Sequence, residues 1–163
     1  MINYNKYKEF VMENISDVDI FNHCKEGLIA EVGEIFGEQK KRFYKKASCS
    51  EELKLEIGDV LFYLVGYSAV DAGELHYTKG DWIEDDWAVE YSKMTAWDSH
   101  KYDLVVSMLP LFSCPKEHPS KKLYEAQMLK AIKRVARANG FSLQDIVEGN
   151  INKLKKRNEC TTK

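Results

Sequence analysis

One stretch of the chain is far more apolar than the rest and constrains the fold most. Over residues 57–70 the sequence reads IGDVLFYLVGYSAV, and Asp59 is its only charged residue. A helix with so few polar positions is expected to be buried on nearly all sides. Gly58 and Gly66 lower its helix propensity, so we expect another helix to approach closely at both positions. The sequence therefore predicts a buried helix over residues 51–72.

Asp59 belongs to one of two acidic pairs in which the members are three residues apart. Glu56 and Asp59 form one pair, and Glu31 and Glu34 form the other, on a helix expected over residues 18–46. Residues three apart lie on one face of a helix, so each pair presents two carboxylates side by side. An isolated ionised carboxylate among apolar residues is costly unless it is paired or bound to a metal.

The two pairs together predict a metal site. Four acids that converge from two packed helices repel one another unless a cation lies between them. Hard divalent cations such as Mg²⁺ prefer oxygen ligands, and nothing nearby supplies the nitrogen and sulfur ligands typical of zinc. We therefore expect a Mg²⁺ site in which Mn²⁺ substitutes; its ligands are Glu31, Glu34, Glu56 and Asp59. In the alternative interpretation, these acids cap helices or pair with Lys and Arg side chains.

The composition indicates a single globular domain. The chain has 163 residues, of which 44% are hydrophobic and 12% aromatic, and this argues against disorder. A net charge of −2, with abundant charges of both signs, does not indicate a protein that binds nucleic acid through its overall charge. No apolar stretch reaches the roughly twenty residues that a membrane-spanning helix needs.

The cysteines and the N-terminal residues indicate a reducing compartment. The four cysteines are scattered and form no C-x-x-C pair; they are Cys24, Cys49, Cys114 and Cys160. Free thiols are the simplest interpretation of this pattern. The polar N-terminal residues hold no sustained apolar run of the kind found in secretory signal peptides. We therefore expect a cytoplasmic protein without disulfides or a zinc cluster.

Apolar periodicity and end signals predict further helices before and after the acidic pairs. Residues 3–14 place aromatic side chains on one face, as in a short amphipathic helix. Residues 123–138 form a basic amphipathic pattern that ends at Asn139-Gly140, a helix-stop signal. A last helix starts at Ser142, with Asp145 at the capping-box position.

These motifs together resemble a known enzyme family. Glu-x-x-Glu at residues 31–34, a spacer, and Glu-x-x-Asp at residues 56–59 before an apolar helix are similar to the signature of the MazG-like nucleotide pyrophosphohydrolases. The last helix resembles the phosphate-binding Asn-x-x-Lys-Leu-x-x-Arg helix of that family; the matching residues are Asn150, Lys153, Leu154 and Arg157. The resemblance covers residues 20–70 and the C-terminal helix.

The resemblance implies an all-α helical bundle and an enzyme. Such an enzyme uses Mg²⁺ to hydrolyse (deoxy)nucleoside triphosphates to nucleoside monophosphate and pyrophosphate. It also implies that Asn150, Lys153 and Arg157 bind substrate phosphates, and their spacing places them on one helix face. Without the resemblance, a solvated basic helix would be the simpler interpretation. One glutamate takes the proton of the attacking water; Glu34 is our candidate, although the spacing does not choose among the glutamates.

The stretch between the third and the C-terminal helices departs from the compact pattern of the family. Residues 73–122 hold all three tryptophans and all three prolines, and their periodicity is weak. Only a short helix over residues 103–112, distorted by Pro110, is expected there. We interpret residues 73–122 as an insertion in a single domain over residues 1–163. It would serve either as a lid over the nucleotide or as an oligomer contact.

The apolar helix also bears on the assembly. Its apolar face needs more cover than a short chain readily supplies, and the resemblance points the same way. We therefore expect a homodimer or homotetramer whose substrate is a nucleoside triphosphate, with no nucleic-acid or membrane partner. Two other interpretations stay open: a non-catalytic helical interaction protein with structural acids, and a metal-dependent hydrolase of another phosphate ester.

Overall fold

Helices make up the protein throughout the residues that the structure describes. The computed structural model describes residues 3–15, 19–45, 50–70 and 95–161, and no strand occurs among them. The helices are α1 (Tyr4–Asn14), α2 (Ile20–Lys45), α3 (Ser50–Ala69), α4 (Thr95–Ser113), α5 (Lys121–Ala138) and α6 (Leu143–Thr161). The all-α prediction is confirmed for this part of the chain.

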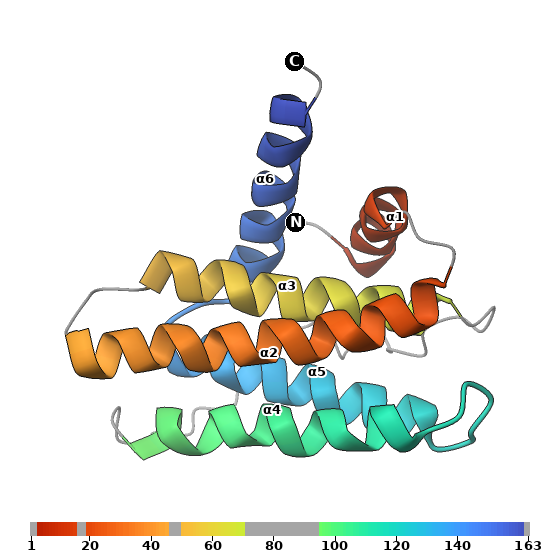
Figure 1. Ribbon diagram of the computed structural model, residues 1–163, viewed down its shortest axis with the longest axis horizontal. Helices are drawn as coiled ribbons and strands as arrows, with labels where there is room; N and C mark the ends of the chain where they lie inside the picture. Colours follow the sequence, from red (N-terminus) through yellow and green to blue (C-terminus); the bar gives the residue numbers. More distant parts are fainter. Residues whose placement is uncertain (1–2, 16–18, 46–49, 71–94, 162–163) are drawn as a thin grey trace.

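Four of the helices run alongside one another and enclose the core (Figure 1). α2 packs against α3 and α4, and α5 packs against the same two helices. α6 stands across this group and packs mainly on α3, while α1 lies beside α6 and also contacts α3 (Figure 1). α3 is therefore covered by α1, α2, α5 and α6.

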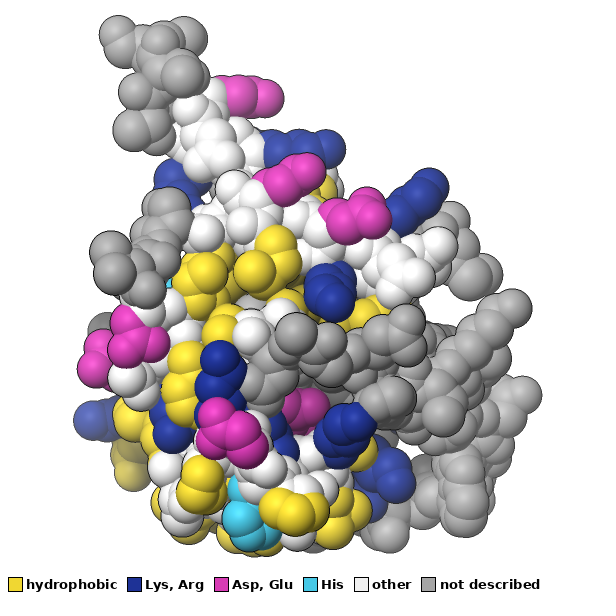
Figure 2. Space-filling model, turned by 90° about the vertical axis from the view of Figure 1, so that its right-hand side faces the viewer, with side chains coloured by type: hydrophobic (Ala, Val, Ile, Leu, Met, Phe, Trp, Pro, Cys, Tyr) yellow, Lys and Arg dark blue, Asp and Glu magenta, His cyan; other side chains and the backbone are white. Residues whose placement is uncertain are grey.

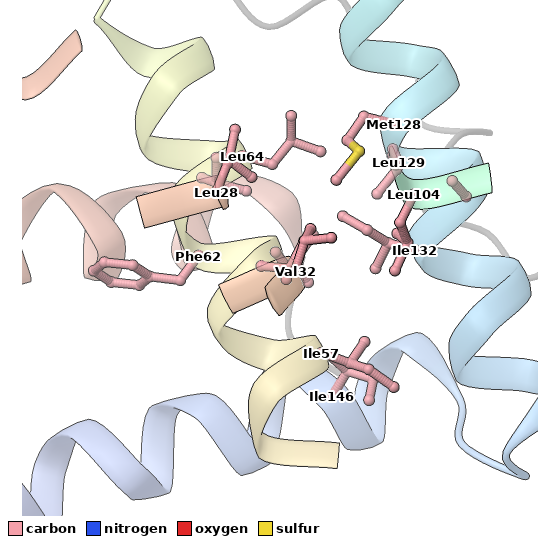
Figure 3. Packing of buried hydrophobic residues seen from close by; sticks show 14 of the residues in the cluster. Leu28, Val32, Ile57, Phe62, Leu64, Leu104, Met128, Leu129, Ile132 and Ile146 are labelled. Carbon is pink, nitrogen blue, oxygen red and sulfur yellow. The ribbon is translucent and has the colours of Figure 1, made fainter. Parts of the chain in front are cut away.

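The core lies where α2, α3, α4 and α5 face one another. Figure 3 shows side chains from all four helices converging there; those labelled include Leu28, Val32, Leu64, Leu104, Met128, Leu129 and Ile132. The apolar side chains of α3 have no exposed surface on several sides of the helix; they include Val60, Leu61, Leu64, Val65 and Tyr67. The predicted burial of this helix on nearly all sides is confirmed.

The cover of α3 comes from its own chain. α4 lies within the range predicted to be an insertion, yet it contributes Leu104, Met108 and Leu111 to the common core. The rest of that range up to residue 94 lies outside the described residues. Because helices of the same chain bury α3, the prediction that its apolar face needs a second copy for cover was wrong.

Two glycines of α3 mark close contacts with other helices. A β-carbon at Gly58 would lie 3.0 Å from the β-carbon of Asn150 and 3.3 Å from the carbonyl oxygen of Ile146. A β-carbon at Gly66 would lie 2.8 Å from the sulfur of Cys24. The close approach predicted at both glycines is confirmed. At Gly58 it allows α6 to lie directly against α3, next to Asp59.

The turn between α5 and α6 sets the start of α6. Gly140 follows the end of α5 with a φ of +83°, a left-handed conformation that suits glycine. The Ser142 backbone N–H donates to Asp145 Oδ2 at 2.8 Å, and the Asp145 N–H donates to Ser142 Oγ at 3.0 Å. This reciprocal pair is the predicted capping box.

The outer surface mixes side chains of different kinds. On the face in Figure 2, hydrophobic, acidic and basic side chains are interspersed among the coloured residues. Among the described helices, none has the length and hydropathy of a transmembrane span.

Candidate metal centre

Three acidic side chains of α2 and α3 come together in the structure. Glu31, Glu56 and Asp59 each offer a carboxylate oxygen, and these atoms lie within 4.8 Å of one another. The three-residue spacing places Glu56 and Asp59 on one face of α3, and α2 packs along α3 with Glu31 beside them. All three residues are partly exposed, so the group is reached from solvent.

Glu34, the fourth predicted ligand, lies outside this group. Its side chain is exposed on α2, three residues after Glu31. The pKa of Glu56 is raised, chiefly by burial, and the charge of Glu34 adds to that rise. The structure therefore brings three of the four predicted ligands together and leaves Glu34 at the edge of the centre.

The electrostatics of the three acids fit a cation site. Burial, followed by the charges of Asp59 and Glu56, raises the pKa of Glu31 to about 7. A carboxyl group that keeps its proton near neutral pH lies where burial and neighbouring negative charges disfavour its ionised form. A divalent cation would relieve the same repulsion that the proton relieves. Because every donor is a carboxylate oxygen, the set suits a hard cation such as Mg²⁺.

α6 contributes a cation and an amide to the centre. The ammonium of Lys153 contacts Asp59 Oδ2 and lies 3.7 Å from Glu56. Burial alone would lower the pKa of Lys153, but the hydrogen bond to Asp59 and the charges of the three acids together outweigh it and the pKa is raised. Asn150 is fully buried: its Nδ2 donates to Asp59 Oδ1 at 2.7 Å, and its Oδ1 accepts from the Tyr7 hydroxyl at 2.9 Å.

A cavity of about 390 Å³ lies beside the acids. Its lining combines acidic and basic side chains with aromatic and amide groups; the lining residues are Asn14, Ile15, His23, Glu31, Asp59, Phe62, Tyr63, Lys153, Leu154 and Arg157. Volumes of about 300–1,000 Å³ are typical of small-molecule sites in proteins. In Figure 3, Phe62 points away from the labelled core residues, which agrees with its place in this cavity.

Two of the three residues predicted to bind phosphate line the cavity. Lys153 and Arg157 are both part of its wall. Asn150 is not, because its buried amide is engaged by Asp59 and Tyr7. The structure therefore places Asn150 behind Asp59 rather than toward a phosphate.

No aromatic residue was predicted to belong to the site. A signal did exist on α2, since His23, Gly27 and Glu31 recur every four residues and so share one face. A β-carbon at Gly27 would overlap the Tyr63 ring, and the His23 ring centroid lies 5.7 Å from that of Tyr63. Tyr7 gave no such signal, because 143 residues separate it from Asn150.

The fold and the site define an all-helical protein with a carboxylate centre and a basic helix beside one cavity. Comparison of the chain with protein-family models, with curated proteins and with solved structures finds no match. The geometry of the centre and the cavity is therefore the basis for the function.

Proposed function

We propose that the chain is a Mg²⁺-dependent hydrolase that converts (deoxy)nucleoside triphosphates to nucleoside monophosphate and pyrophosphate, as its MazG-like motifs imply. The observation that carries the proposal is the convergence of three acids with Lys153 beside one cavity. A triphosphate bound as its magnesium complex needs oxygen ligands for the cation and positive groups for the phosphate oxygens. Both kinds of group are present in this one site.

Three residues would hold the cation: Glu31, Glu56 and Asp59. When bound, Mg²⁺ neutralises charge on the triphosphate and lowers the pKa of a bound water. Mn²⁺ is expected to substitute, because it also accepts carboxylate ligands. Glu34, exposed on α2 three residues after Glu31, stays our candidate to take the proton of the attacking water.

The cavity supplies groups for the rest of the nucleotide. Lys153 and Arg157 are basic residues of its wall. They would bind phosphate oxygens and stabilise the negative charge that develops on them in the transition state. Phe62, Tyr63 and His23 offer ring surfaces on which a nucleobase can stack. The site therefore has separate groups for the metal, the phosphates and the base.

We also propose that the protein forms a homodimer through α4. Tyr102, Val106 and Leu109 are 58%, 67% and 57% exposed, although all three are apolar, and their spacing puts them on one face of α4. Two antiparallel copies of α4 would pair Tyr102 with Leu109 of the second copy and place Val106 near the two-fold axis. An isologous contact needs this kind of self-complementary spacing.

Light scattering coupled to size exclusion tests the dimer. Val106→Glu is expected to give a monomer, whereas Leu123→Glu, at an exposed position on α5, should leave the assembly unchanged. A wild-type protein that stays monomeric at high concentration would contradict the dimer without affecting the proposed activity.

The proposed activity is tested by pyrophosphate release from a panel of nucleoside and deoxynucleoside triphosphates. Release should require Mg²⁺ or Mn²⁺ and should stop with a chelator. Asp59→Asn should remove it, while Glu26→Gln, an exposed acid on α2, should not. A folded protein that binds no Mg²⁺ and hydrolyses none of the triphosphates would favour the non-catalytic interaction protein instead.

A further inference from the structure

Tyr7 lies at the end of a hydrogen-bond chain that reaches the metal centre from the core. Its side chain is completely buried in α1, and its hydroxyl donates to Asn150 Oδ1 at 2.9 Å. Asn150, also completely buried, donates through Nδ2 to Asp59 Oδ1 at 2.7 Å. These two hydrogen bonds therefore join α1, α6 and α3 behind the three carboxylates.

The chemistry of the three groups fixes the direction of these hydrogen bonds. An ionised carboxylate only accepts hydrogen bonds, so Asn150 must turn its NH₂ group toward Asp59. The amide oxygen then faces Tyr7, whose hydroxyl can donate to it. Without that hydroxyl, the buried oxygen of Asn150 would lose its partner. A flipped amide would then place its oxygen against the Asp59 carboxylate, which is unfavourable.

The two oxygens of Asp59 have partners of different kinds. Oδ2 meets Lys153, whose side chain is 37% exposed, so this ammonium can turn to solvent when a cation takes its place. Oδ1 meets Asn150, which is fully enclosed and has no access to water. A cation can therefore replace Lys153 at Oδ2, while the contact at Oδ1 persists.

We infer that Tyr7 is a positioning residue of the metal centre, which acts through Asn150 to hold one oxygen of Asp59 so that the other faces the cation. The inference rests on the proposed function, because it requires that Asp59 is a metal ligand. Tyr7 itself is neither one of the three acids nor one of the residues that line the cavity. Its effect is on the orientation of a ligand.

A second tyrosine on α1 provides a matched control. Tyr4 lies one turn before Tyr7, and its buried hydroxyl is near Glu125, away from the metal centre. Tyr4→Phe and Tyr7→Phe each remove one buried hydroxyl from the same helix. An effect on the metal centre that comes only from changing a buried tyrosine of α1 would therefore appear in both variants.

The test is the Mg²⁺ dissociation constant of the metal-free full-length protein, measured by titration calorimetry. Tyr7→Phe should raise it roughly three- to tenfold, the effect of one lost hydrogen bond, and Tyr4→Phe should leave it unchanged. On an Asn150→Ala background, Tyr7→Phe should add nothing further, because Tyr7 acts through Asn150.

Three results would overturn the inference. The first is equal Mg²⁺ affinity in Tyr7→Phe and wild type, and the second is an equal loss in Tyr4→Phe. The third is a Tyr7→Phe effect of undiminished size on the Asn150→Ala background. If instead the wild-type protein binds no Mg²⁺, the proposed function itself fails and the role of Tyr7 fails with it.

Discussion

The ammonium of Lys153 lies against Oδ2 of Asp59, although 94 residues separate the two along the chain. The same ammonium lies 3.7 Å from Glu56, so two acids share one positive charge. This charge lowers the pKa of Glu31, yet burial and the other acids still raise it to about 7. Lys153 therefore compensates only part of the negative charge, and a divalent cation that binds Asp59 would have to share the place of this ammonium or replace it.

We predict opposite effects of Lys153→Met on metal binding and on turnover. Catalytic efficiency should fall about ten- to a hundredfold, because one charged contact to phosphate is lost. Mg²⁺ affinity in the absence of nucleotide should stay the same or rise, because the positive charge of Lys153 no longer competes with the cation. Calorimetry and steady-state kinetics measure the two effects. Lys155→Met, at an exposed position on α6, is the control. Loss of Mg²⁺ binding in Lys153→Met would contradict the assignment.

We predict that Glu31→Gln removes activity but makes the metal-free protein more stable. At pH 8 the variant lacks one of three acids that repel one another in a partly buried group. Because Glu31 is partly exposed, solvent screens the gain, and we expect about 1 kcal/mol, or about 2–4 °C in the unfolding midpoint. Glu26→Gln should change neither property. Thermal unfolding with and without Mg²⁺ measures the change in stability. A metal-free Glu31→Gln variant that is less stable than wild type would argue against repulsion among the three acids.

We predict that Mg²⁺ binds more tightly as the pH rises from 6 to 8. The pKa of Glu31 is about 7, and the cation must displace the proton, so the affinity should rise about tenfold over this range. Calorimetry at several pH values measures the change. Glu31→Gln should abolish most of this pH dependence. An equally steep dependence in that variant would mean that another titrating group causes it.

The same pKa predicts how the stability of the metal-free protein depends on pH. The pKa of Glu31 in the folded protein lies above its ordinary value of 4.5, so the folded state binds this proton more tightly than the unfolded state. The resulting stabilisation is fully present below about pH 4.5 and is lost as the pH rises through about 7. Denaturant unfolding of wild type and Glu31→Gln should therefore diverge across this interval. Parallel curves would contradict the raised pKa.

We predict that Gly58→Ala weakens both the fold and the metal centre. The added methyl group would lie 3.0 Å from the β-carbon of Asn150 and would push α6 away from α3. Overpacking of this kind costs about 1–3 kcal/mol, which exceeds the gain in helix propensity of about 1 kcal/mol. Mg²⁺ affinity should fall because Asn150 moves away from Asp59.

Gly33→Ala is the matched control for that substitution. Gly33 is an exposed position within α2, and a β-carbon there meets no other atom within 4 Å. The change should stabilise the protein by up to about 1 kcal/mol through helix propensity and leave Mg²⁺ affinity unchanged. Denaturant unfolding and calorimetry compare the two variants, and equal effects would refute the close contact at Gly58.

The sequence predicted four ligands, and Glu34 was included although the apolar spacing of α2 sets it apart from Glu31. On α2, the buried residues Leu28, Val32 and Ile35 define the inward face. Glu31 lies at the edge of that face, whereas Glu34 lies further round the helix and is exposed. The apolar spacing therefore already distinguished the two glutamates. The pairing of Asn150 with Tyr7 could not be predicted, because it depends on how α6 meets α1.

The helices with clear periodicity were predicted to within three residues, and α4 was not. The second helix was expected over residues 18–46 and is observed over Ile20–Lys45. For α4, a helix over residues 103–112 was expected, but the helix spans Thr95–Ser113 and includes Pro110. Its first half is polar in sequence, and Pro110 lacks a backbone donor but lies in the last turn, so the interruption affects only the C-terminal end of the helix. The helices on which α4 packs, α2 and α5, could not be predicted from a local pattern.

The bond that the protein breaks is the most direct test of the proposed function. The chain contains no Gly-rich P-loop with Lys-Ser or Lys-Thr, so γ-phosphate hydrolysis of that kind is not expected. Phosphorus NMR of a deoxynucleoside triphosphate incubated with the protein and Mg²⁺ follows every product at once. An analogue with a blocked β–γ bridge should still be cleaved, and one with a blocked α–β bridge should inhibit.

We predict that monophosphate and pyrophosphate appear together in equal amounts, and that no diphosphate forms at any time. Both signals should be absent with Asp59→Asn and present with Glu26→Gln. Accumulation of nucleoside diphosphate and orthophosphate would contradict the proposed reaction, even if Glu31, Glu56 and Asp59 bind Mg²⁺.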